Sequence, residues 1–248
     1  MKRNICIQIC ADNEWDAVKQ IFSKVQYQKG SERGYEYIIN LCDVFQCIYF
    51  FSGASKTYAA AGCQFAIQRW NPYMLFVAGS AGGVGADLKE LDLVIANQTV
   101  QYDCISRMGD EIQLFYKDFI VDFDNSWIIW DQLYDKLLEG LIATADQDID
   151  YALRNKLQSH GVLAADWESG AIAPICLKNQ VPCCIIRGIT DVPVEPDSDV
   201  EQGNSFRKNT PGVMQRLILN ILPALLAMIE KSDTKLAKLQ NSSSFYHE

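Results

Sequence analysis

Histidine is almost absent from this 248-residue chain, which contains only His160 and His247. His247 lies in a polar tail, so the sequence argues against a nucleophile activated by histidine, as in Ser-His-Asp or Cys-His sites. Clusters of basic residues are also missing, and the formal net charge is −9 with a pI near 4.8. Nucleic acid requires a basic surface and is therefore not an expected partner, whereas small neutral or cationic ligands fit the composition.

Signals for metal, disulfide and membrane are lacking too. The nine cysteines are scattered, odd in number and without recurring zinc spacing, so we interpret them as buried free thiols of a cytoplasmic protein. We expect no metal site and no organic cofactor. Lys2 and Arg3 precede only a brief apolar run, which does not make a signal peptide. The longest C-terminal apolar stretch, Leu217 to Ile229, is too short to cross a bilayer, so no membrane contact is expected.

Strand and helix patterns alternate along the chain, which predicts one α/β domain over residues 1–230 and a flexible tail over 231–248. The expected strands are Ile5–Cys10, Tyr35–Leu41, Val44–Phe51, Tyr73–Ala78, Leu91–Tyr102, Gly140–Ala145 and Cys183–Gly188. The expected helices are Glu14–Val25, Lys56–Trp70, Ser126–Leu138, Ile149–His160, a short one after Glu168, and a last one that begins at Thr210 and Pro211. The polar stretch that precedes this last helix, Val192 to Lys208, is predicted to be a mobile active-site loop.

The stretch from residue 163 to 193, LAADWESGAIAPICLKNQVPCCIIRGITDVP, is the most informative. Its continuous apolar run is typical of a central parallel strand that is covered on both faces, and ligands bind at the carboxyl ends of such strands. Asp191 follows this strand, Glu168 lies in the preceding loop with Asp166, and Glu14 follows the first strand. Each acid taken singly also fits a turn or a helix N-terminus. Together, carboxylates at one rim suit a transition state with oxocarbenium character.

A glycine-rich turn, Gly79 to Gly85, follows another apolar strand. Backbone N–H groups in such a turn can face a ligand, although the segment also fits a bare turn. A dinucleotide-binding fold would need a helix to start here, whereas Leu88 to Ile95 indicates a further strand. The sequence therefore does not favour a Rossmann fold.

Four segments together resemble the purine nucleoside phosphorylase/nucleosidase superfamily, and within it the 5′-methylthioadenosine/S-adenosylhomocysteine nucleosidases. The segments are Gly79–Gly83 (GSAGG), Gln101–Asp103 (QYD), Asp166–Ala173 (DWESGAIA) and Arg187–Asp191 (RGITD). The likeness runs in order from Ile5 to about Leu225. It implies a three-layer α/β/α sandwich around a mixed, partly curled central sheet. It also implies a homodimer in which a loop near Asp103 to Met108 covers the neighbour's site.

The resemblance further implies roles for individual residues. Asp191 matches the acid that protonates the purine at N7, for which burial must raise its pKa. Glu168 matches the carboxylate that accepts hydrogen bonds from the ribose 2′- and 3′-hydroxyls, and Glu14 matches the acid that orients the attacking water. The remaining matches are Trp167 under the sugar, Ser80 and Gly82 in the turn near water and base, and Ile149, whose backbone reads the adenine edge.

Three departures from the family pattern bear on these roles. Asp148 stands where the family has an aromatic residue that stacks on the base, which puts the identity of the base in question. Trp167 is bulkier than the usual methionine and narrows the sugar or 5′ pocket. Pro174, inside the short helix after Glu168, removes a hydrogen bond to the Gly170 carbonyl.

The choice between water and phosphate rests on missing cations. A phosphate dianion is typically bound by arginine, but Val77 stands where related phosphorylases carry one. The turn Ala11 to Asn13 also lacks the Gly and Arg of a phosphate loop. We therefore expect hydrolysis of the N-glycosidic bond of a purine nucleoside, with a 5′-thio-substituted adenosine (methylthioadenosine or S-adenosylhomocysteine) as substrate. The alternatives are a phosphate-dependent phosphorylase and a nucleoside-binding module without turnover, which Asp148 motivates.

Overall fold

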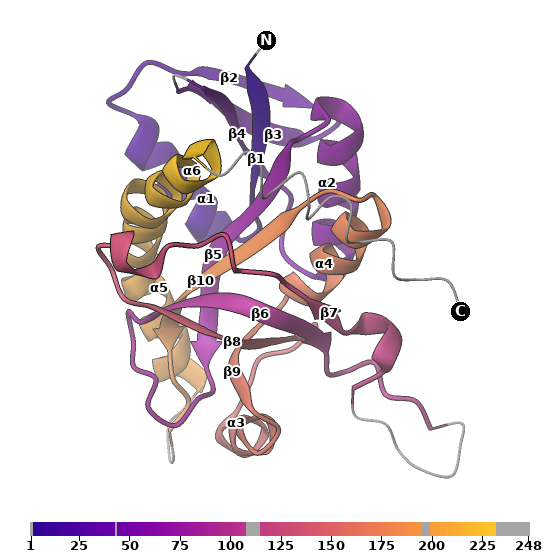
Figure 1. The fold of residues 1–248 in the computed structure, drawn as a ribbon. Helices are drawn as coiled ribbons and strands as arrows, with labels where there is room; N and C mark the ends of the chain where they lie inside the picture. The colour runs from indigo at the N-terminus through magenta and orange to yellow at the C-terminus, as the bar shows by residue number, and fades with distance from the viewer. Residues whose placement is uncertain (1, 43, 108–114, 195–198, 232–248) are drawn as a thin grey trace.

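A ten-stranded mixed sheet lies between two layers of helices in the computed structural model, which describes residues 2–42, 44–107, 115–194 and 199–231 (Figure 1). One face is covered by α1 (Asp12–Phe22), α5 (Asp199–Arg216) and α6 (Leu222–Lys231). The opposite face is covered by α2 (Lys56–Trp70) and α4 (Ser169–Lys178). The expected three-layer α/β/α sandwich is confirmed. Residues 232–248 of the predicted tail, and 108–114, which include the last residue of the predicted dimer loop, lie outside the described residues.

Part of the sheet closes on itself. The strands are β1 (Arg3–Ile9), β2 (Gln28–Glu32), β3 (Tyr35–Leu41), β4 (Phe45–Phe51), β5 (Met74–Gly83), β6 (Leu93–Gln101), β7 (Val121–Asp122), β8 (Leu137–Thr144), β9 (Val162–Asp166) and β10 (Cys183–Asp191). Pairing runs from β5 through β10, β6, β8 and β9 back to the end of β5. Strand β1 pairs with the first half of β5, and the sheet continues from it through β4 and β3 to β2. This ring is the partly curled sheet that we expected. Helix α3 (Tyr151–Gln158) lies between β8 and β9 in the chain.

Strand β10 has neighbours on both edges, parallel β5 and antiparallel β6. Its side chains alternate between the two cores: Cys184 and Ile186 join the cluster under α1, α5 and α6, while Ile185 and Ile189 join the one under α2 and α4. Because both faces are covered, the run Cys183 to Ile186 is apolar at every position, and burial of each isoleucine contributes about 1.5–3 kcal/mol. The prediction of a central strand covered on both faces is confirmed, but the strand is parallel only to β5 and antiparallel to β6.

Helix α4 contains Pro174, and the structure supplies a partner for the carbonyl that the proline leaves unbonded. The Gln101 side-chain amide donates to the Gly170 carbonyl over 2.8 Å. A Cβ at Gly170 would lie 2.8 Å from the Val100 carbonyl, so glycine permits the close approach of α4 to β6. The lost helical hydrogen bond is therefore replaced by a contact between helix and sheet.

The helix predicted over Ser126–Leu138 is wrong. The chain forms only a single 3₁₀ turn there, Trp130–Gln132, and β8 already begins at Leu137. Trp127 and Ile128 are buried in the cluster under α1, α5 and α6. Their apolar spacing therefore reflects contact with other elements and not the face of a helix.

The predicted loop Val192–Lys208 is also wrong over residues 199–208, because α5 begins at Asp199 and continues past Pro211. The Thr210 hydroxyl donates to the Phe206 carbonyl over 2.6 Å within this helix. A π turn, residues 217–221, then joins α5 to α6 just before Pro223. A π turn widens the helix locally, which accommodates the proline ring.

The joined helical stretch is longer than the apolar run Leu217–Ile229 suggested. Residues 201–231 form a helix that is long and apolar enough to cross a membrane by length and composition alone. However, 56% of its most apolar window is buried inside the protein, and Leu222 and Leu225 are fully buried against the sheet. Its apolar character is therefore accounted for by the core.

Candidate active site

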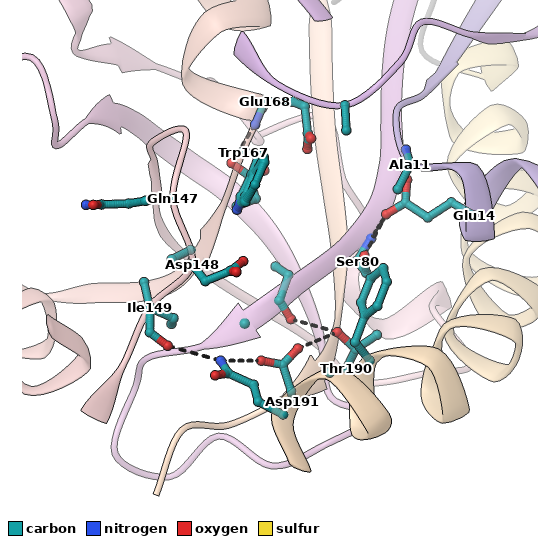
Figure 2. A pocket seen from close by; sticks show the side chains of 18 of the residues that line it. Ala11, Glu14, Ser80, Gln147, Asp148, Ile149, Trp167, Glu168, Thr190 and Asp191 are labelled. Carbon is teal, nitrogen blue, oxygen red and sulfur yellow. Dashed lines mark hydrogen bonds between the residues drawn. The ribbon is translucent and has the colours of Figure 1, made fainter. Parts of the chain in front are cut away.

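A cavity of about 610 Å³ lies where several strands end (Figure 2). Strands β1, β5 and β10 are parallel, so their carboxyl ends meet at one rim. Strand β9 pairs antiparallel with the end of β5 and arrives from the other direction. All of the residues predicted for the site line this cavity: Glu14, Ser80, Gly82, Ile149, Trp167, Glu168 and Asp191.

Asp191, the last residue of β10, is buried at the base of this cavity. Its Oδ1 accepts a hydrogen bond from the Thr190 hydroxyl at 2.8 Å, and its Oδ2 accepts one from the Gln202 amide at 2.9 Å. Burial raises the pKa of Asp191, the two donors oppose that rise, and the charges of Asp148 and Glu90 add to it. Asp191 is thus a carboxyl group with an environment suited to holding a proton.

Arg187 is fully buried and organises a cluster of carboxylates beside the cavity. Its guanidinium lies 2.7 Å from Asp166 Oδ2 and 3.4 Å from Glu168 Oε2, and it donates to the Ser169 hydroxyl. Asp166 was predicted in a loop but ends β9, where it also accepts hydrogen bonds from the Thr144 and Ser169 hydroxyls. Its oxygens are therefore occupied within the protein, which makes Asp166 a structural partner of Arg187.

Glu168 is less completely bonded than Asp166. Among the described residues, the Arg187 guanidinium and the Ser55 backbone N–H both donate to its carboxyl group over a long distance of 3.4 Å. Burial raises the pKa of Glu168 to about 8, although the positive charge of Arg187 opposes the rise. The carboxyl group faces the cavity (Figure 2), so its remaining acceptor positions are available to hydroxyl groups of a ligand.

Glu14 is held firmly at the opposite wall. Its Oε1 accepts from both the backbone N–H and the hydroxyl of Ser80 at 2.6 Å, and its Oε2 accepts from the backbone N–H groups of Ala11 and Cys10. A Cβ at Gly79 would lie 2.8 Å from Glu14 Oε1, so the glycine leaves room for this contact. Glu14 and Ser80 therefore form one unit at the cavity wall.

The remaining predicted residues surround the space between these acids. Trp167 is 37% exposed and lines the cavity above Asp148 in Figure 2. A Cβ at Gly82 would lie 3.1 Å from Ile149 Cδ1 and 3.5 Å from Asp191 Oδ2, so its absence keeps the space beside them open. Ile149 is buried, and its carbonyl oxygen accepts a hydrogen bond from the side-chain amide of Gln202.

Asp148 projects its carboxyl group into the cavity (Figure 2), where the family pattern has an aromatic residue. The cavity nevertheless has aromatic walls, because Phe206 from α5 lines it together with Trp167. Among the described lining residues none is lysine, arginine or histidine. Within the same part of the chain, no group of three or more potential ligand side chains is arranged to hold a metal ion.

Sequence reasoning assigned no role to Arg187, Gln202 or Phe206. An arginine inside a strand covered on both faces was a usable signal, because a buried cation requires carboxylate partners. Gln202 and Phe206 lie in a stretch predicted to be a loop. No spacing in the sequence connects either residue with Asp191.

A partly closed mixed sheet between two helical layers, with acidic side chains around a cavity at its strand ends, defines a nucleoside phosphorylase-like protein. The chain belongs to the Phosphorylase superfamily, whose family model matches residues 5–222. The resemblance seen in the four sequence segments is thereby confirmed.

Individual relatives agree with this assignment. The chain is 26% identical over 211 residues to a 5′-methylthioadenosine/S-adenosylhomocysteine nucleosidase of Buchnera aphidicola, covering 81% of this chain and 86% of the relative. It is 26% identical to the aminodeoxyfutalosine nucleosidase of Helicobacter pylori, covering 65% and 72%. Among solved structures, futalosine hydrolase of Helicobacter pylori has a TM-score of 0.77 at 22% identity, covering 92% and 98%. At this identity the structural likeness establishes the fold.

Proposed function

We propose that this protein hydrolyses the N-glycosidic bond of a purine nucleoside, with a 5′-thio-substituted adenosine such as methylthioadenosine or S-adenosylhomocysteine as substrate. The observation that carries the proposal is that Asp191 and Glu168 face the same cavity from its two ends. The names of relatives such as the Buchnera nucleosidase support the substrate class. The apolar faces of Trp167 and Phe206 suit a thioether, and the Ile149 carbonyl suits the amino group of adenine.

In the proposed reaction the base leaves as a neutral molecule. Asp191 transfers its proton to N7, and the electron pair of the bond between C1′ and N9 moves to the base. The reaction uses the ionised form of Glu168, which the charge of Arg187 and the positive charge that develops on the sugar both favour against burial. This carboxylate accepts hydrogen bonds from the ribose hydroxyls and stabilises the charge on the sugar. The attacking water forms a bond from its oxygen to C1′ and gives a proton to the unit of Glu14 and Ser80. The products are free adenine and the free sugar.

Water is the proposed acceptor because the cavity offers a phosphate dianion little positive charge. The described lining contains no lysine or arginine, and Arg187 behind it is already engaged by two carboxylates. Val77, at the position of the phosphorylase arginine, is fully buried in the core under α2 and α4. Phosphate would therefore meet mainly acids in this cavity.

The test is to incubate the purified protein with methylthioadenosine, in buffer with and without inorganic phosphate, and to identify the products by mass spectrometry. We expect adenine and free methylthioribose at equal rates in both buffers. A strict requirement for phosphate, with sugar 1-phosphate as product, would establish phosphorolysis instead. Tight binding of the nucleoside without release of base, unchanged in Asp191→Asn, would indicate a binding module.

We also propose that the protein is a homodimer in the cytoplasm. Tyr58 and Ile105 are exposed apolar side chains, each two residues from the ion pair between Lys56 and Asp103. Such residues support a partner surface on that side. The nine free thiols support a reducing compartment. Sedimentation equilibrium checks the first proposal and cell fractionation the second; a monomer at micromolar concentration, or a membrane-bound or secreted protein, would contradict them.

A further inference from the structure

Gln202, in the first turns of α5, connects two parts of the cavity wall. Its side-chain amide donates to Asp191 Oδ2 over 2.9 Å and to the Ile149 carbonyl over 3.1 Å. The dashed lines that leave Ile149 and Asp191 in Figure 2 mark these two hydrogen bonds. An amide group has two N–H donors, and both are used here. One neutral side chain thus joins the end of β10 to the segment before α3.

The two oxygens of Asp191 are held by donors from different elements. The Thr190 hydroxyl, which donates to Oδ1, is placed by β10 itself, whereas the Gln202 amide is placed by α5. Removing Gln202 would therefore free one carboxyl oxygen without disturbing the strand. Asp191 can keep a defined orientation relative to the Ile149 carbonyl only while both donors are present.

We propose that Gln202 is a positioning residue for Asp191, which fixes the carboxyl oxygen Oδ2 beside the Ile149 carbonyl and stabilises the carboxylate left after proton transfer. The catalytic part of this inference rests on the proposed nucleosidase function. A glutamine suits the task because it donates a hydrogen bond without a full positive charge. A lysine there would hold Asp191 ionised before the reaction and so deprive it of its proton.

The negative charges near Asp191 raise its pKa, whereas the hydrogen bond from Gln202 lowers it. Asp148, before α3, and Glu90, in the turn before β6, both favour the protonated form of Asp191. Arg154, a cation on α3, donates to the Pro193 and Gly85 carbonyls. The hydrogen bonds of Gln202 and Thr190 are thus what favours the ionised form against burial.

The test compares wild type with Gln202→Met, which keeps the length of the side chain but cannot donate. The Asp191 carboxyl carbon is titrated by ¹³C NMR in the unliganded protein, with Asp191→Asn to assign its signal. Loss of a hydrogen bond to a charged group should raise the proton affinity of Asp191 about tenfold, so its titration midpoint should move up by about one pH unit. A second variant, Gln202→Glu, adds a like charge and should move the midpoint further. Asn204→Met, exposed on the same helix, is the matched control and should leave it unchanged.

Activity provides a second readout. In Gln202→Met the alkaline limb of the kcat/KM profile for methylthioadenosine should move up by the same pH interval. At a pH where Asp191 is protonated in both proteins, kcat should fall about tenfold because the Asp191 carboxylate left after proton transfer is less stabilised. A midpoint equal to that of wild type in both Gln202 variants, or a loss of activity without a shift of the limb, would overturn the proposal. If wild type cleaves no nucleoside, the proposed function fails, and the NMR titration still decides the role of Gln202.

Discussion

The two ends of the cavity treat their carboxyl groups differently. The end at Glu168 is built around a buried cation, Arg187, which lies within 3.4 Å of both Glu168 and Asp166. At the end with Asp191, the donors within the described part of the chain are neutral, Gln202 and Thr190, and further acids lie nearby. Side chains of the same chemistry can therefore take different tasks, since one end is suited to an acceptor of hydrogen bonds and the other to a donor of a proton.

The strongest test of this difference is Asp191→Asn. Asparagine keeps the shape but carries no acidic proton, so kcat for methylthioadenosine should fall by about 10²–10⁴-fold, while the affinity for a nucleoside changes little. Steady-state kinetics and calorimetric titration measure the two effects. Equal loss of binding and turnover would assign Asp191 a structural role.

Removing the charge of Arg187 should destabilise the end of the cavity at Glu168. In Arg187→Met the carboxyl groups of Asp166 and Glu168 stay buried without their partner, and the free energy of unfolding should fall by about 3–5 kcal/mol. Urea denaturation measures it. The control is Arg69→Met, which removes an ion pair with Glu32 at the surface and should leave stability nearly unchanged. A similar small effect in both variants would show that Arg187 does not hold the cluster together.

Glu168→Gln tests whether the end at Arg187 reads the sugar. The loss of charge-assisted hydrogen bonds to the ribose hydroxyls should lower kcat/KM by about 10–100-fold. A 2′-deoxy substrate should be cleaved more slowly than the ribonucleoside by wild type, and the difference should shrink in the variant. An undiminished preference for the ribonucleoside in Glu168→Gln would place the hydroxyl contact elsewhere.

The pH dependence of the stability of Glu168→Gln tests the raised pKa of Glu168. The pKa of Glu168 is about 8 in the folded protein, above its usual value of about 4.3. The folded state therefore binds a proton more tightly than the unfolded state, and the associated stability is lost as pH rises from about 4.3 to 8. Glu168→Gln cannot titrate, so it should gain stability relative to wild type between pH 5 and 8. If urea denaturation gives the same difference in the free energy of unfolding between variant and wild type at all pH values, the raised pKa of Glu168 is contradicted.

The smallest effect is expected at Asp148. Asp148→Phe restores an aromatic face and should increase the affinity for the nucleoside by about 2–10-fold, whereas Asp148→Asn removes only the charge. Asp148→Asn should also move the Asp191 titration midpoint down, because a neighbouring negative charge is lost. Tighter binding in Asp148→Asn than in Asp148→Phe would show that charge, and not stacking, limits affinity.

The sequence by itself determined the layers of the fold and the residues gathered at the cavity. Apolar runs such as Cys183 to Ile186 predict strands covered on both faces, because a strand with no face in water needs apolar side chains at successive positions. Five of the seven predicted lining residues lie within the four family segments. The other two, Glu14 and Ile149, came from matches outside those segments. Where pattern came from contact with distant helices, as at Trp127 and Ile128, it led to a wrong helix.

Tertiary structure decided which acids are saturated and which remain available. The antiparallel approach of β9 places Asp166 and Glu168 beside Arg187, and the early start of α5 brings Gln202 to Asp191. These contacts join residues from different elements, and Gln202 is bonded across 53 positions of sequence to Ile149. Hydrogen bonding and burial, which set the proton affinity of each carboxyl group, depend on such distances in space and leave no periodic trace in the chain.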